Sequence, residues 1–295
     1  MKRNTNRRTF IKYVGAGAAA LMLAILPAIV SAAGSPQKKP NIILILTDDQ
    51  GWTDTSVQMM TNRPDSKSEY YQTPNLERMA KEGMTFSNAY SPAPVCTPTR
   101  VSIQWGKTPA RLRSTGHYRS ARRDFNDEIS VAQVIKAADS NYRAAHFGKW
   151  GGQKTTPQHA GYDSSDGNTN NYHGDWRSLT DKRPIPLDNP KQIFGLGQRA
   201  NKFMEDQVKA GHPFYLQVSH YAVHSQHRAL KKTIEKYRNL PRGEKCMPED
   251  YQSPPPGVND WILEYAAMIE NLDTSVGMLL NKIDELGIKD NTYII

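Results

Sequence analysis

The sequence contains little cysteine, and this scarcity limits the kinds of protein it can encode. Only Cys96 and Cys246 occur among its 295 residues. Two cysteines cannot form the dense disulfide framework of a small secreted domain. A single bridge between them stays open, because spacing along the sequence does not show whether two thiols lie within bonding distance.

The sequence also lacks the compositional excesses of disordered and polytopic membrane proteins. Charged residues make up 23% and hydrophobic residues 38% of the chain, and no internal repeat is evident. These values are typical of globular proteins. The length suits one large α/β domain or two smaller ones, with ample material for a buried core.

The first 33 residues have the three parts of a secretory signal peptide. Residues 1–12 are basic, residues 14–30 are uncharged and apolar, and Ser31-Ala32-Ala33 offers small residues for cleavage. The run from Asn6 to Lys12 contains Arg7-Arg8 and resembles the twin-arginine signal, which exports folded bacterial proteins. We therefore expect export by the twin-arginine machinery to the periplasm or the medium. An uncleaved N-terminal anchor stays open as the alternative.

The positive charge of the chain is concentrated in this leader. The formal net charge is +9, and the five lysines and arginines of residues 1–33 leave about +4 for the rest. A mildly basic body suits an anionic substrate but is equally common on an ordinary solvated surface. We expect no nucleic-acid partner.

Apolar runs and helix-ending residues predict strands that alternate with helices. The expected strands cover residues 41–47, 142–147 and 214–219, and a further strand starts at 292. The expected helices cover residues 74–82 (capped by Thr73), 98–105, 130–138, 193–210 and 261–286, and residues 162–190 and 242–258 are expected to be long loops. Such alternation predicts an α/β fold with a mostly parallel sheet flanked by helices on both faces.

The segment 261–286 is the clearest of these helices. Its apolar residues alternate spacings of three and four and so form one stripe. They are Ile262, Tyr265, Ile269, Leu272, Val276, Leu279, Ile283 and Leu286. A helix packed on the sheet is favoured over a coiled coil, because Gly287 ends the helix and a new strand follows.

Two adjacent carboxylates, Asp48 and Asp49, follow the first predicted strand. In parallel sheets of this kind, ligands bind beyond the carboxyl ends of the strands. Two neighbouring carboxylates are costly to bury unless a cation neutralises them, and oxygen ligands suit calcium or magnesium. A solvated turn or a helix cap is the alternative.

The run Cys96-Thr97-Pro98-Thr99-Arg100 is the most specific motif in the sequence. Pro98 predicts a helix whose N-terminus lies beside Cys96, and this end of a helix favours anions. Arg100 is placed to hold a tetrahedral anion or the nucleophile itself. A buried structural cysteine and a thiolate phosphatase stay open, although a phosphatase loop places its arginine six residues after the cysteine.

Residues 39 to about 116 closely resemble the sulfatases, a family of the alkaline phosphatase superfamily. The matching runs are PNI at 40–42, TDDQG at 47–51, TPNL at 73–76, GMTFSNAY at 83–90 and the Cys-x-Pro-x-Arg motif. The resemblance implies an alkaline phosphatase-like fold, with residues 34–295 as the N-terminal part of a catalytic domain. It also implies hydrolysis of a sulfate ester, on a sulfated carbohydrate or an aryl sulfate.

The resemblance further implies a modified nucleophile and a metal. A dedicated maturation enzyme would oxidise Cys96 to formylglycine, whose hydrated aldehyde attacks sulfur. Asp48, Asp49 and the modified Cys96 would bind calcium, with magnesium as an alternative, and Arg100 would hold the nucleophile.

Two further residues match positions of the family that contact the substrate. Lys149, in Gly148-Lys149-Trp150, matches the lysine that contacts the sulfate. His224 matches the histidine near the leaving-group oxygen. A surface lysine and a solvated loop histidine stay open as simpler interpretations.

The chain departs from the family pattern at two places. The family usually has histidine two residues after the lysine, where this chain has Gly151, and His159 is the candidate substitute. The family strand that matches residues 292–295 continues into an Asp-Asn pair that completes the calcium site, whereas this sequence stops at Ile295. We therefore expect a C-terminally truncated domain.

These departures keep two other functions open. One is a phosphoesterase or phosphonate hydrolase of the same superfamily, which shares the metal and the fold. The other is an inactive protein that binds sulfated glycans, which the glycine at 151 and the expected truncation favour.

Overall fold

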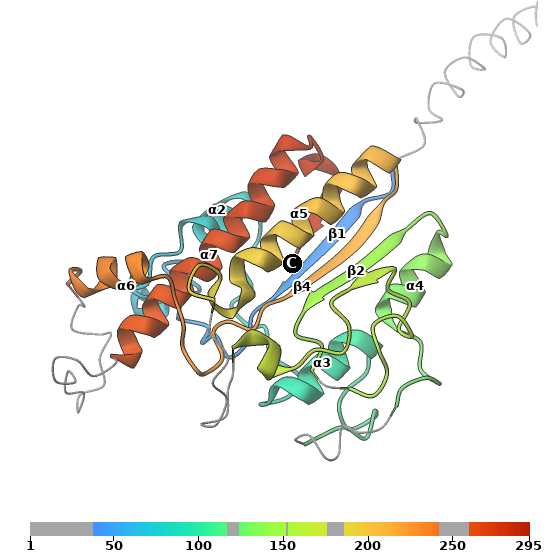
Figure 1. Cartoon of the computed structure of the whole chain (residues 1–295), viewed down its shortest axis with the longest axis horizontal. Coiled ribbons are helices and arrows are strands. Elements are labelled where there is room, and N and C mark those ends of the chain that lie inside the picture. Colours follow the sequence, from blue (N-terminus) through green and yellow to red (C-terminus); the bar gives the residue numbers. More distant parts are fainter. Residues whose placement is uncertain (1–37, 117–123, 152, 176–185, 242–259) are drawn as a thin grey trace, which may run out of the picture. The chain divides into compact units, whose positions relative to one another are not determined.

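A parallel β-sheet organises the part of the chain that the computed structural model describes, residues 38–116, 124–151, 153–175, 186–241 and 260–295 (Figure 1). In these residues the strand order is β3-β2-β4-β1-β5, and every neighbouring pair is parallel. The strands are β1 (Asn41–Leu46), β2 (Arg143–Gly148), β3 (Ser164–Ser165), β4 (Phe214–Ser219) and β5 (Thr292–Ile294). The predicted α/β class and the predicted parallel sheet are confirmed. The expected signal peptide and Cys246 lie outside the described residues.

Helices cover both faces of this sheet, as expected. The α-helices are α2 (Pro74–Glu82), α3 (Cys96–Trp105), α4 (Val131–Ala138), α5 (Ile193–Ala210), α6 (Lys231–Arg238) and α7 (Trp261–Glu285). Short 3-10 segments are η1 (Pro64–Ser66), η3 (Asn171–Gly174), η4 (Pro190–Gln192) and η5 (Lys289–Asn291). The five helices expected from sequence are confirmed, whereas α6, β3 and the 3-10 segments were not predicted. Within the described residues, no helix is long and apolar enough to cross a membrane.

The two faces of the sheet bury separate hydrophobic clusters. Leu196 of α5 and Leu279 of α7 pack with Ile43 on one face. Val101 of α3 and Ala132 of α4 pack on the other, with side chains of β1, β2 and β4. Every residue of β4, the central strand, is buried. Six of the eight residues of the stripe predicted on α7 are buried, and two of them, Leu279 and Ile283, pack in the cluster on the first face of the sheet.

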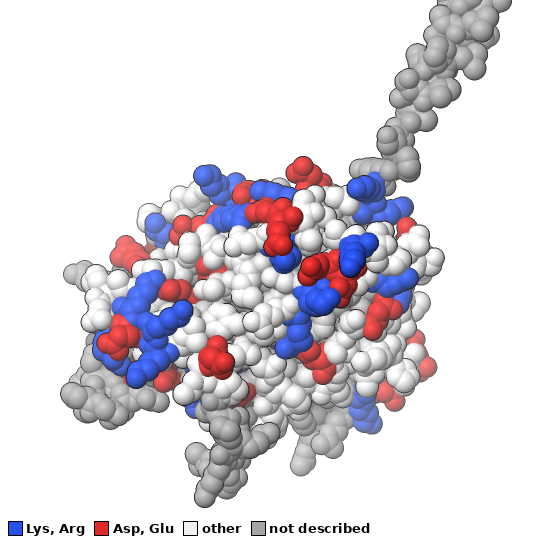
Figure 2. All heavy atoms as spheres, turned by 45° about the horizontal axis from the view of Figure 1, so that its top comes forward, with Lys and Arg blue, Asp and Glu red and all other residues white. Residues whose placement is uncertain are grey.

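Charged side chains do not gather into one region of the surface in view. Figure 2 shows lysine and arginine interspersed with aspartate and glutamate over this face. The described residues therefore do not form a single basic patch on this face.

The N-terminus of α2 is capped by a distant residue rather than by its neighbour. Thr73 occupies the cap position, but its hydroxyl makes no cap hydrogen bond. Asp273 on α7 accepts the N–H groups of Asn75 at 3.0 Å and Leu76 at 2.8 Å instead. The prediction that Thr73 caps this helix is therefore wrong, because a buried carboxylate from another helix satisfies the free N–H groups.

A buried polar network connects the sheet with α3. Gln217 of β4 accepts hydrogen bonds from Gln104 at 2.7 Å and from the hydroxyl of Tyr162 at 3.2 Å. Its own amide donates to Ser219 Oγ at 3.1 Å, and Ser219 lies 3.1 Å from Nε2 of His146. Such a connected network fixes side chains that would otherwise be costly to bury.

His146 makes the stability of this network sensitive to acid. Burial, and then the charge of Arg100, lower its pKa from 6.5 to about 3. Below pH 6.5 the unfolded chain therefore takes up a proton that the folded chain binds only near pH 3, and stability falls across this window. From pH 7 to pH 5, we predict that the free energy of unfolding of the wild type falls by about 2 kcal/mol more than that of His146→Gln.

Urea denaturation at the two pH values measures this difference. Gln replaces imidazole with a neutral polar group, so its packing cost should be the same at both pH values. The same substitution at the exposed His159 serves as the control. A difference between His146→Gln and the wild type that does not change with pH would contradict the prediction.

Candidate active site

The candidate site residues predicted from the sequence follow the carboxyl ends of three neighbouring strands. β1 is followed by Asp48 and Asp49, β2 by Lys149, and β4 by the loop that carries His224. Backbone hydrogen bonds hold these strand ends together, including Asp48 N to the Ala222 carbonyl at 2.9 Å. Because the strands are parallel and adjacent, their carboxyl ends form one edge of the sheet.

Asp48 is the centre of this edge. Its side chain is only 3% exposed, and Nη2 of Arg100 donates to its Oδ1 at 3.1 Å. The ammonium of Lys149 pairs with the other oxygen, Oδ2. Arg100 also donates from Nη1 to the Lys149 carbonyl at 2.7 Å. One buried carboxylate therefore ties together β1, α3 and the end of β2.

The charges of this triad favour an anionic ligand. Burial raises the pKa of Asp48, but Arg100 and Lys149 outweigh burial and bring the pKa below its ordinary value of 3.8. Asp48 is therefore ionised at neutral pH. Two cations around one carboxylate leave the buried centre with a net positive charge, which attracts a sulfate or a phosphate.

His224 lies between a carboxylate and an amide rather than free in solvent. Its Nε2 lies 3.6 Å from Oδ2 of Asp49 and 3.4 Å from the side-chain nitrogen of Asn171. Its Nδ1 lies 2.6 Å from the carbonyl oxygen of Ser225, which can only accept. Nδ1 therefore carries a proton, and in the neutral ring Nε2 is left as the acceptor.

Cys96 is the first residue of α3, so the predicted helix beside it is confirmed. Val95 at the cap position supplies no side-chain hydrogen bond, and the first turn contains no acidic residue. The N–H groups of this helix end are therefore available to an anion. Cys96 is half-buried and makes no disulfide within the described residues.

The residues expected to hold a metal are brought together only in part. Within the described residues, no three His, Cys, Asp or Glu side chains gather as a metal site would require. Asp48 and Asp49 provide carboxylate oxygens of the kind that calcium binds. These two residues fit part of a calcium site, and Cys96 does not join them in a group of three.

Gly151 has a backbone conformation that disfavours the histidine found in the family. Its φ of 104° lies in a region that residues with a side chain rarely adopt. A Cβ atom at this position would lie 3.2 Å from Cδ of Arg100. The candidate substitute, His159, is exposed and hydrogen-bonded through its backbone to Gln133 and Thr156, so its contacts give no support for that role.

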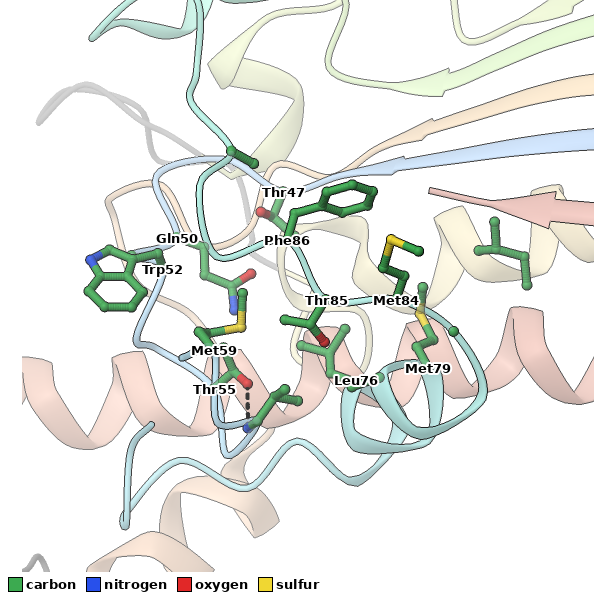
Figure 3. A pocket seen from close by; sticks show the side chains of 16 residues that line it. Thr47, Gln50, Trp52, Thr55, Met59, Leu76, Met79, Met84, Thr85 and Phe86 are labelled. Atoms are coloured by element: carbon green, nitrogen blue, oxygen red, sulfur yellow. Dashed lines mark hydrogen bonds between the residues drawn. The ribbon is translucent and has the colours of Figure 1, made fainter. Parts of the chain in front are cut away.

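An apolar pocket of about 460 Å³ lies beside the Asp48–Asp49 loop and is separate from the charged triad (Figure 3). Trp52 lies at one end of it, and Met79 and Met84 lie at the other. Its lining comes from the loop after β1, from α2 and from residues 83–89, and includes Ile294 of β5. None of the residues proposed for chemistry lines this pocket.

The sulfatase family model matches residues 40–295, the whole span from β1 to the last strand. The chain belongs to the sulfatase family. This match covers far more than half of the chain, and the parallel sheet flanked by helices agrees with the alkaline phosphatase-like fold that the resemblance implied.

Individual sulfatases agree with this assignment. The ulvan-active sulfatase of Formosa agariphila is 29% identical over 87% of this chain and 49% of its own length. The N-acetylgalactosamine-6-sulfatase of Canis lupus familiaris is 28% identical over 93% of this chain and 52% of its own length. The PsFucS1 sulfatase of Pseudoalteromonas has the same fold, with a TM-score of 0.60 and 21% identity over 92% of this chain and 56% of that one. This sulfatase chain thus spans about half the length of the relatives it matches.

The structure also places residues near the site that sequence analysis did not select. Asn171 contacts His224, and Lys191 is buried close by. Asn171 belongs to a 3-10 segment within the expected loop 162–190, and Lys191 belongs to one that begins at the end of this loop. No motif marks them, because their positions depend on how distant segments meet.

Replacing Asp48 should be far more costly than replacing an exposed aspartate. Asp48→Asn leaves Arg100 and Lys149 buried without a carboxylate, so we predict a loss of about 3–5 kcal/mol in the free energy of unfolding. Asp206→Asn, which breaks the exposed Lys202–Asp206 pair, is the matched control and should change it little. Urea denaturation at pH 7 with a calcium chelator measures both. Equal losses for Asp48→Asn and Asp206→Asn would contradict the stabilising role of Asp48 in the triad.

Proposed function

We propose that this sulfatase-family chain carries the nucleophile side of a site that hydrolyses sulfate esters. The observation that supports it most strongly is the arrangement of Cys96 at the free N-terminus of α3 with Arg100, Lys149 and Asp48 behind it. Arg100 and Lys149 pair with Asp48, and Arg100 lies one turn after Cys96 on α3. These cations and the first N–H groups of α3 would stabilise a sulfuryl group beside Cys96.

Each residue then has a defined task. Formylglycine formed from Cys96 would supply a hydrated aldehyde as nucleophile, and calcium at Asp48 and Asp49 would supply a Lewis acid. Lys149 and the N–H groups of α3 stabilise the charge that develops on the sulfuryl oxygens, and Arg100 orients Asp48. His224 would donate a proton to the leaving-group oxygen from Nε2, which requires the imidazolium form because Nε2 of the neutral ring only accepts.

The substrate we propose is a sulfated carbohydrate. The names of two relatives refer to carbohydrates, ulvan in one case and N-acetylgalactosamine in the other. Phosphoester hydrolysis is the second candidate, because the charged centre binds either tetrahedral anion. An inactive protein that binds sulfated glycans would keep the charged centre and lack turnover.

Maturation of Cys96 is the first test. Co-expression with a formylglycine-forming enzyme should convert Cys96, and mass spectrometry of its peptide should show loss of sulfur and gain of oxygen. The same peptide from cells without that enzyme serves as the control. An unmodified thiol after co-expression would remove the proposed nucleophile.

Paired substrates test the reaction itself. In a version extended to the length of the relatives, with matured Cys96 and calcium, an aryl sulfate should be hydrolysed faster than the matching aryl phosphate, and Cys96→Ala should reduce turnover at least about 1000-fold. Faster turnover of the phosphate would favour the phosphoesterase. Binding of the sulfate without turnover would favour the inactive glycan binder.

We also propose export through the twin-arginine machinery, which the Arg7-Arg8 run supports. Changing both residues to lysine keeps the charge and should retain the protein in the cytoplasm, where the wild type should leave with cleavage near Ala33. Fractionation followed by N-terminal sequencing distinguishes the two. Normal export of the double variant would indicate the general secretory route.

A further inference from the structure

Lys191 is a buried cation to which the proposed reaction gives no task. The residue is only 1% exposed. In the part of the chain that the structure describes, its ammonium has neither a hydrogen bond nor a carboxylate at ion-pair distance. Burial of a charge is costly without a partner, so an anion bound beside Lys191 would stabilise its charged form.

The backbone places Lys191 at the active-site edge of the sheet. It belongs to η4, directly before α5, and α5 leads back to the amino end of β4. The start of α5 therefore lies at the opposite end, where the strands deliver Asp48, Lys149 and His224.

Hydrogen bonds connect Lys191 with His224 through η3. The Lys191 N–H donates to Oδ2 of Asp175 at 2.7 Å, and Asp175 directly follows η3. Asn171 of the same segment contacts His224. Lys191, Asp175 and Asp49 all adopt left-handed φ values, of 54°, 62° and 60°. Left-handed φ is unfavourable for lysine and less so for aspartate, and such conformations cluster at functional sites.

The charges around Lys191 do not compensate its burial. Burial has the largest effect and lowers its pKa to about 8. Asp175 raises the pKa and Arg228 lowers it, and both act more strongly than Asp48 and Lys149. The ammonium is therefore mainly protonated at pH 7.

Arg228 has charge available for the same ligand. Its guanidinium donates to the His227 carbonyl at 2.9 Å and lies 4.0 Å from Glu264, the limit of an ion pair. Arg228 follows His224 by four residues in the loop after β4. After burial, the charges of Lys191, His224 and Arg228 lower the pKa of His227, so these groups lie around one another.

We propose that Lys191 and Arg228 bind a second anionic group of the substrate, a carboxylate or a second sulfate on the sugar that carries the scissile ester. This inference rests on the proposed sulfate-ester function and adds a specificity determinant to it. It predicts preference for substrates with two acidic groups over substrates with one.

Binding of three probes tests the proposal without requiring turnover. The probes are sulfated disaccharides that differ only beside the sulfate ester, where they carry a hydroxyl, a carboxylate or a second sulfate. Calorimetric titration of the unmatured chain at pH 7 with calcium should show at least tenfold tighter binding of one or both acidic probes. The probe that binds more tightly identifies the acidic group.

Variants assign this preference to the two cations. Lys191→Met should reduce the preference for the acidic probe over the hydroxyl probe below twofold, and Lys191→Arg should keep it. Lys202→Met, at an exposed lysine, is the matched control. Circular dichroism shows whether Lys191→Met is folded. If it is not, Arg228→Met tests the same preference. Equal binding of the three probes by the wild type, or an unchanged preference in both folded Met variants, would overturn the subsite alone. No binding of any probe would overturn the sulfate-ester function as well.

Discussion

The pairing of one buried carboxylate, Asp48, with two buried cations is the interaction on which the rest of the site depends. Arg100 comes from α3 and Lys149 from the end of β2, so the triad joins three segments that are far apart in the sequence. None of the three charges is stable alone in this environment. The position of Cys96 follows from it, because Cys96 begins the helix that carries Arg100.

The triad also explains why the site suits anions although it contains two adjacent aspartates. The charge of Asp48 is outweighed by its two partners, whereas Asp49 remains more than half exposed beside His224. A divalent cation bound at this pair would compete with Lys149 for the same carboxylate. Ligand binding and the internal ion pairs are therefore linked energetically.

The sequence predicted the features that depend on local pattern and on the rule for parallel sheets. Cys96 at a helix start, and Asp48 and Lys149 at neighbouring strand ends, follow from apolar runs and from the motif. The cap of α2 by Asp273 and the burial of Lys191 could not be predicted, because they depend on contacts between distant segments.

The energetic coupling between Asp48 and Lys149 tests the central claim most directly. A double-mutant cycle of Asp48→Asn and Lys149→Met, measured by urea denaturation in a calcium chelator, isolates their interaction from the cost of each change. The buried pair predicts a coupling of at least about 2 kcal/mol. If the loss in free energy of unfolding of the double variant equals the sum of the two single losses to within about 0.5 kcal/mol, the two charges do not hold the strand ends together.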